Sequence, residues 1–224
     1  MKVTPSMIVI AAVLAACSPQ PKPAETPKTA ASPVAAQSGS DAPAGEYAMD
    51  LSHTSVNFRL SHLGLSFYTA RFTQADGKLA FDPAKPAAQG VSVTIDAGSL
   101  QTNYPDAAKL DFDALVEKEF LAAQTFPQIT FTSTKVELTG PRTARVTGDL
   151  SLHGVMKPVT LEATFNGGYP AGGMDPAGAR IGFSAKGSFK RSDFGIAYGL
   201  PAPGSTMGVG DQIEVTIESE FTKK

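Results

Sequence analysis

The chain has 224 residues, of which 42% are hydrophobic and 18% are charged, and its formal net charge at pH 7 is −2. This nearly neutral balance, without a cluster of Lys and Arg, gives no support to nucleic-acid binding. The only cysteine is Cys17, so an internal disulfide is excluded.

The N-terminus resembles a bacterial lipoprotein signal. Lys2 supplies a positive charge, and the apolar run 7–13 is too short to span a bilayer as a helix. Small residues then stand directly before Cys17. We expect a signal peptide over 1–16 and lipid attachment at Cys17, which would anchor the protein in the bacterial cell envelope. Ser18 after the cysteine favours the outer membrane as the location, with the protein facing the periplasm. The alternative is an ordinary secretory signal in which the cysteine is incidental.

Residues 17–44 read as a lipidated cysteine followed by a flexible tether. Pro, Ala, Ser and Thr dominate this stretch, and no apolar periodicity appears in it. Residues 45–224 are then long enough for one domain.

Within this domain, apolar and polar side chains alternate with a period of two, which predicts antiparallel strands with one buried face. Three pairs, Asp76-Gly77, His153-Gly154 and Gly167-Gly168, and the loop 201–210 are turn signals. Many short strands without a strand–helix rhythm predict an all-β sandwich or closed barrel. The alternating runs are 56–60, 91–95, 129–131, 136–138, 146–152, 159–165, 181–189 and 213–221.

One segment, 105–123, predicts a short helical excursion. Pro105 suits a helix start, Asp106 suits a first turn, and Val116 and Phe120 are spaced for one helical face. We expect one or two short helical pieces that cover an end of the barrel, with a moving lid as the alternative.

Two polar residues continue the inward-facing phase of their strands. His62 follows the phase of Phe58 and Leu60, which predicts either a core histidine or a contact to a ligand head. Arg191 follows the phase of Phe189, and an inward guanidinium needs a partner. We expect a structural ion pair with a carboxylate, Asp193 first; the alternative is that Arg191 binds the polar head of a ligand.

Catalytic and metal signatures are absent from the sequence. No two histidines share a metal-ligand spacing such as His-x-x-x-His, and no cysteine can join them as a ligand. The Gly-x-Ser-x-Gly motif of a nucleophile elbow does not occur either. We therefore expect no enzyme activity, no metal and no cofactor.

Four blocks occur in this order: YAMDLSHTSVNFRLSHLGL at 47–65, FPQITFTST at 126–134, GDLSLHGVMKPVTL at 148–161 and KRSDFGI at 190–196. Together they resemble the YceI-like family of bacterial envelope proteins. The resemblance covers roughly residues 45–222. It implies a lipocalin-like, extended antiparallel β-barrel whose interior tunnel holds a polyisoprenoid or another long-chain amphiphilic lipid.

On this reading the protein binds or carries such a lipid without catalysis. Two alternatives stay open: an envelope scaffold whose core is packed solid, and an accessory to quinone or redox metabolism. The oligomeric state is open, a dimer included. His62 and Arg191 are the expected polar head contacts, and the expected lining of the apolar cavity is Phe58, Leu60, Ile95, Phe131, Leu161, Ile181, Phe183 and Phe189.

Overall fold

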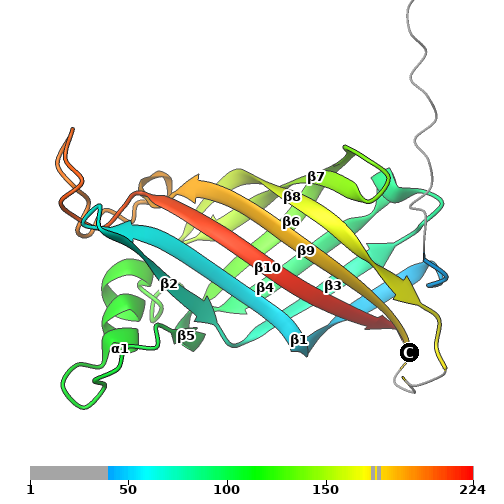
Figure 1. Cartoon of the computed structure of the whole chain (residues 1–224), viewed down its shortest axis with the longest axis horizontal. Helices are drawn as coiled ribbons and strands as arrows, with labels where there is room; N and C mark the ends of the chain where they lie inside the picture. The colour runs from blue at the N-terminus through cyan, green and yellow to red at the C-terminus, as the bar shows by residue number, and fades with distance from the viewer. Residues whose placement is uncertain (1–39, 173–174, 176–177, 224) are drawn as a thin grey trace, which may run out of the picture. The chain divides into compact units, whose positions relative to one another are not determined.

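The structure is a computed structural model that describes residues 40–172, 175 and 178–223. A β-barrel occupies most of these residues (Figure 1). The predicted signal peptide, Cys17 and all but the last residues of the predicted tether lie outside the described part. Among the described residues, no helix is long and apolar enough to cross a membrane.

The barrel is one antiparallel sheet that closes on itself. Its strand order is β10-β9-β8-β7-β6-β4-β3-β1-β2-β5, and β10 also pairs with β1. Because β3 and β2 pair with successive halves of β1, they behave as one bent strand, and the closed barrel has eight strands. The predicted fold class is therefore confirmed. The strands are β1 (Gly45–His62), β2 (Ser66–Phe72), β3 (Ala75–Phe81), β4 (Gly90–Asp96), β5 (Leu100–Gln101), β6 (Gln128–Leu138), β7 (Thr143–Leu152), β8 (Val155–Tyr169), β9 (Ala179–Lys190) and β10 (Gln212–Lys223).

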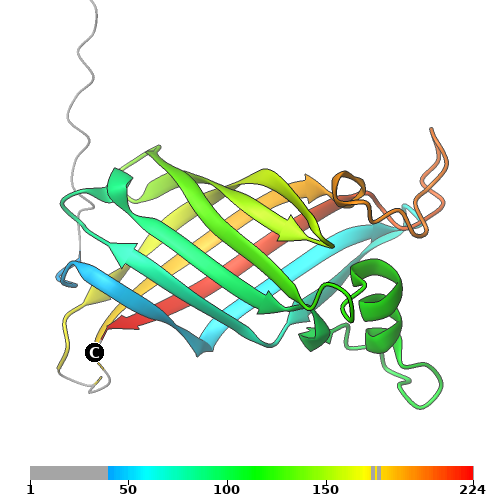
Figure 2. The ribbon, with the colours of Figure 1, turned by 180° about the vertical axis from the view of Figure 1, so that it is seen from behind.

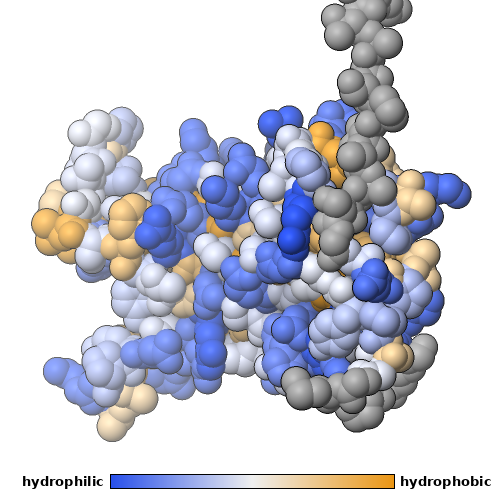
Figure 3. All heavy atoms as spheres, turned by 45° about the vertical axis from the view of Figure 1, so that its right-hand side comes forward, coloured by the Kyte–Doolittle hydropathy of each residue, from blue (hydrophilic) through white to orange (hydrophobic). Residues whose placement is uncertain are grey.

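The period-two pattern of the sequence sets which face of each strand is wet. In β9, Phe183, Ala185 and Phe189 face the interior, while Ser184, Lys186 and Ser188 face outward. On the face shown in Figure 3, hydrophilic side chains predominate over the barrel wall. The alternation therefore separates an apolar lumen from a polar exterior.

Short helices cover one end of the barrel (Figure 2). They are α1 (Phe112–Val116) and the π-helix η3 (Glu117–Leu121), both inside the predicted excursion 105–123. The helix begins later than Pro105 suggested, because the side chain of Asp111 caps it by accepting a 3.0 Å hydrogen bond from the backbone N–H of Ala114. Three 3₁₀ helices complete the fold: η1 (Pro86–Ala88), η2 (Ala97–Ser99) and η4 (Arg191–Phe194).

Of the four turn signals, His153-Gly154 and the loop 201–210 are confirmed, whereas Asp76-Gly77 and Gly167-Gly168 lie inside strands. His153 and Gly154 form the tight β7–β8 turn, with left-handed φ angles of 54° and 75°. Asp76 and Gly77, by contrast, lie inside β3. A Cβ at Gly77 would come within 2.9 Å of Cε of Met49, so this glycine gives a neighbouring strand room.

Two clusters of buried residues lie toward the two ends of the barrel. The cluster beside the short helices contains Ala97, Ile129, Leu152, Val159, Phe194 and Ile196. The cluster at the opposite end contains Ala42, Tyr47, Leu79, Phe81, Phe165, Ala179, Ile181 and Phe221. The middle of the barrel lies between these clusters.

Candidate functional site

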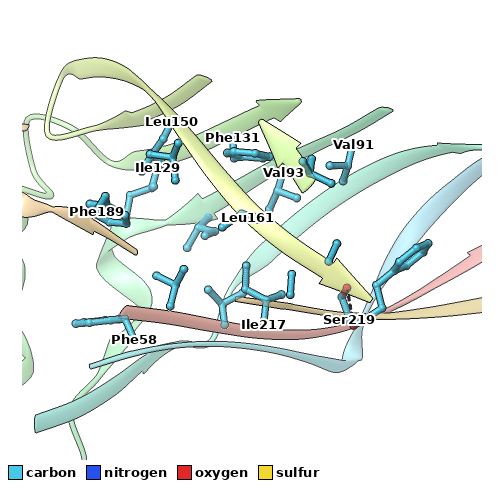
Figure 4. Close-up of a pocket in the computed structure, with 18 of the residues that line it drawn as sticks. Phe58, Val91, Val93, Ile129, Phe131, Leu150, Leu161, Phe189, Ile217 and Ser219 are labelled. Carbon is cyan, nitrogen blue, oxygen red and sulfur yellow. Dashed lines mark hydrogen bonds between the residues drawn. The ribbon is translucent and has the colours of Figure 1, made fainter. Parts of the chain in front are cut away.

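An apolar cavity of about 270 Å³ lies inside the barrel. Side chains from all around the wall point into it, among them Phe58 of β1, Phe131 of β6 and Leu161 of β8 (Figure 4). An engineered protein cavity of about 150 Å³ already accepts benzene, so this space admits part of an apolar chain. The cavity has the character of a small-molecule site.

Two glycines on the inward face, Gly148 and Gly187, make room for large side chains of the neighbouring strands. A Cβ at Gly148 would lie 2.4 Å from the ring of Phe131, and one at Gly187 would lie 2.6 Å from Cδ2 of Leu161. Both large side chains therefore lie over a glycine of the neighbouring strand. With a bulkier residue at either position, Phe131 or Leu161 would have to shift.

Seven of the eight predicted lining residues do line the cavity: Phe58, Leu60, Ile95, Phe131, Leu161, Phe183 and Phe189. Ile181 does not, because it is only 1% exposed and packs in the buried cluster with Phe81 and Phe165. That these residues contact a ligand stays a prediction.

The helical end contributes lining that the sequence did not reveal. Phe120 and Leu121 of η3 reach the cavity from outside the sheet, beside Arg191. In the sequence, only the helical spacing of Phe120 with Val116 was visible, and this spacing does not indicate which surface the helix covers.

Arg191 is the most buried charged residue of the described chain, with 2% exposure. Its guanidinium donates three hydrogen bonds to backbone carbonyls: from Nε to Gly210 at 2.9 Å, from Nη1 to Ile196 at 2.9 Å and from Nη2 to Val209 at 2.7 Å. The guanidinium carbon also lies 5.5 Å from the ring centre of Phe120. Arg191 thus fastens the loop before β10 to the covered end of the barrel.

The predicted ion pair of Arg191 with Asp193 is wrong. The strand ends at Lys190, and the chain then turns into η4, so the alternation stops and Asp193 is exposed. The described residues offer Arg191 no ion pair; carbonyls take the place of the carboxylate. Burial lowers the pKa of Arg191, and the negative charge of Asp211 opposes this shift.

Comparison with known proteins identifies the family of the chain. Residues 47–221 match the model of the YceI-like domain. The chain belongs to the YceI-like family. It is 40% identical over 184 residues to a UPF0312 protein of Pseudomonas syringae pv. tomato, across 81% of this chain and 89% of that protein. It is also 40% identical over 165 residues to a UPF0312 protein of Pseudomonas fluorescens, across 72% of this chain and 81% of that protein.

Solved structures share the fold of this YceI-like protein. BcnA of Burkholderia cenocepacia superposes with a TM-score of 0.62 at 26% identity, covering 77% of this chain and 98% of BcnA. The YceI protein of Campylobacter jejuni superposes with a TM-score of 0.60 at 32% identity, covering 73% of this chain and 90% of that protein. A polyisoprenoid binding domain from Saccharophagus degradans superposes with a TM-score of 0.55 at 14% identity, covering 80% of this chain and 98% of that domain. This likeness shows a common fold.

His62 does not line the cavity of this YceI-like protein. It is the last residue of β1 and is exposed at the rim, where its backbone pairs with Val209. The inward phase of Leu60 ends there, because Leu63 and Gly64 adopt left-handed φ angles of 55° and 70° and turn the chain into β2. The predicted inward orientation of His62 is therefore wrong.

One cluster elsewhere has the composition of a metal site. The possible ligand atoms of Asp50, His53 and Glu220 lie within 4.8 Å of one another. However, Nη1 of Arg180 lies 2.7 Å from the carboxylate of Asp50 and 2.6 Å from that of Glu220, and its Nε lies 2.7 Å from Asp175. Hydrogen bonds from His53 and Arg180 hold the pKa of Asp50 well below its usual range. The cluster is best explained as an ion-pair network centred on a guanidinium.

Proposed function

We propose that this YceI-like protein binds and carries a long-chain isoprenoid or a similar amphiphilic lipid in the bacterial cell envelope, without catalysing a reaction on it. The observation that carries the proposal is the unfilled, apolar interior of the barrel, about 270 Å³ in volume. Burying apolar surface there yields about 25 cal/mol per Å². The Saccharophagus neighbour, which shares the fold, is itself described as a polyisoprenoid binding domain.

The cavity lining favours binding over catalysis. The only ionisable side chains among the described lining residues are Arg142 and Arg191. Arginine keeps its proton in proteins, so neither residue suits general acid–base chemistry. The unfilled cavity also argues against the alternative of a scaffold protein, because the core of such a barrel would be filled by its own side chains.

The proposed location follows from the sequence. Cys17 would carry the lipid anchor after removal of residues 1–16, and residues 18–44 would tether the barrel to the membrane. The barrel would then face the periplasm from the outer membrane.

Mass spectrometry of natively purified protein, combined with a titration of prenyl alcohols, tests the binding proposal. We expect a co-purifying long-chain lipid. We also expect affinity to rise with each added isoprene unit until the cavity is full, because each buried CH₂ contributes about 0.8 kcal/mol before ordering costs. A protein that carries no lipid and binds short and long prenyl chains equally would contradict the proposal. Recovery of a quinone would favour the link to redox metabolism.

A further inference from the structure

At the end of the barrel that lies away from the helices, the lining of the cavity reaches a solvent-exposed residue. Beside the helices its lining is covered: Ile196 and Leu152 are buried, and Phe120 packs over Arg191. At the other end, the described lining includes a single exposed residue, Arg142.

Two connections border this end of the cavity. The segment 82–89 joins β3 to β4 and brings Gln89 and Gly90 to the lining, and the segment 139–142 joins β6 to β7 and brings Arg142. Figure 1 shows both connections at the end opposite α1, and Figure 2 shows the same from behind. We call the region between these two connections the mouth.

We propose that the mouth binds the anionic head group of the lipid, a phosphate or a carboxylate, through the guanidinium of Arg142, while the apolar chain occupies the barrel. This inference rests on the proposed lipid-binding function and adds the class of head group and the orientation of the ligand.

The Arg142 side chain is held in place before any ligand binds. Its Nε donates a 2.8 Å hydrogen bond to the carbonyl of Phe165, and its Nη2 donates to the carbonyl of Asn166, where β8 has an irregular register. The guanidinium carbon also lies 5.6 Å from the ring centre of Phe165. No partner of Nη1 is found among the described residues, so N–H groups remain for a ligand. A preorganised planar guanidinium suits the oxygens of phosphate and carboxylate groups.

The side chains around the mouth carry a net positive charge, which complements an anionic head group. The β6–β7 hairpin, 135–145, carries three basic residues and one acid, Glu137, which pairs with Lys135 at 2.8 Å. A shallow depression beside the mouth includes Lys85 and shares Val136 with the cavity. The segment 82–89 also carries the acid Asp82, so this segment and the hairpin together carry four bases and two acids. The helical end, 104–121, carries five acids and two bases. An anionic head is therefore attracted to the mouth rather than to the helical end.

The test compares three probes with the same prenyl chain: geranylgeraniol, geranylgeranyl phosphate and geranylgeranoic acid. Isothermal titration of the wild-type protein should show about tenfold tighter binding of both anions than of the alcohol. Arg142→Gln should remove this preference and leave alcohol binding within about twofold. Inorganic phosphate alone should not compete, since its affinity lacks the contribution of the chain.

Arg145→Gln is the matched control. Arg145 lies in the same hairpin, but between the lining residues Ala144 and Val146, so its side chain is on the outer face. This variant loses the same charge and should keep the preference for anions. Equal loss in both variants would overturn the assignment to Arg142.

A second variant covers the case in which Arg142→Gln unfolds because the carbonyls of Phe165 and Asn166 lose their donor. Arg142→Lys keeps the charge and loses the planar fork, so it should weaken the preference for anions several-fold. An unchanged preference in Arg142→Lys, or a wild-type protein that binds alcohol and anions equally, contradicts the proposal. A wild-type protein that binds none of the three probes would instead refute the lipid-binding function itself.

Discussion

Arg191 shows how a side chain can be placed correctly by a sequence pattern and still be given the wrong partner. The alternation of β9 predicts an inward guanidinium, and the structure buries it. Its partners are the carbonyls of Ile196, Val209 and Gly210, which belong to a loop with no regular pattern. This geometry supports the structural role of Arg191 over the role of a head-group contact.

Substitution of Arg191 tests that role. Arg191→Met removes three donors from carbonyls at the covered barrel end, so we expect the free energy of unfolding to fall by about 3 kcal/mol. Chemical denaturation of the ligand-free protein measures this loss. Arg191→Lys, which keeps the charge but offers fewer directed donors, should recover only part of it.

The opposite pattern would assign Arg191 to the ligand. If Arg191→Met is as stable as the wild type and binds anionic lipids selectively less well, the structural role is wrong. The same titrations with geranylgeraniol and geranylgeranyl phosphate distinguish the two cases.

At the scale of elements, β9 carries the clearest division between lumen and solvent. Ala185 lines the cavity, whereas Ser188 lies on the outer face of the same strand. The small side chain of Ala185 leaves part of the lumen open, whereas Leu161 of β8 takes the space over the inward Gly187.

Filling that space should block binding. In Ala185→Phe the added ring would occupy the lumen, so we expect binding of a long prenyl alcohol to weaken by tenfold or more, on the order of 1.4 kcal/mol. Ser188→Phe adds the same ring to the outer wall and should bind like the wild type. Fluorescence displacement or calorimetry on the folded variants measures both. Unchanged binding by Ala185→Phe would mean that the lipid does not occupy the barrel.

The helical segment illustrates how element boundaries depend on capping. The spacing of Val116 and Phe120 predicts a helix, and η3 confirms a helical piece there. Its start is set by the side chain of Asp111 rather than by Pro105. Several residues in this acidic stretch can cap a helix, so the sequence alone does not select one.

At the scale of the whole molecule, the proposed anchor at Cys17 would set the cellular location of the barrel. Replacing residues 1–17 by a cleavable secretory signal should release a folded barrel into the soluble periplasmic fraction. The reason is that the lipid chains at Cys17 would supply the membrane affinity. Cell fractionation with immunodetection measures this release.

The control for this exchange replaces residues 1–17 with the signal and lipidated cysteine of another lipoprotein. That protein should stay with the membranes. If the version with the secretory signal also sediments with the membranes at the wild-type level, the proposed anchor does not account for the location.

The sequence by itself determined the architecture and most of the lumen. A period of two sorts side chains between two faces of a strand, so Phe58, Phe131 and Leu161 could be assigned inward without any structure. The order of four sequence blocks indicated the family, which the match over 47–221 confirms.

Only the tertiary structure decided what happens where strands end. Ile181 is packed rather than lining, His62 faces solvent, Asp76-Gly77 is strand rather than turn, and Arg191 binds carbonyls. The mouth at Arg142 was likewise hidden, because it combines two connections that are far apart in the chain. The physical reason is that periodicity reports the faces of a strand, whereas closure of the barrel decides which residues meet at its ends.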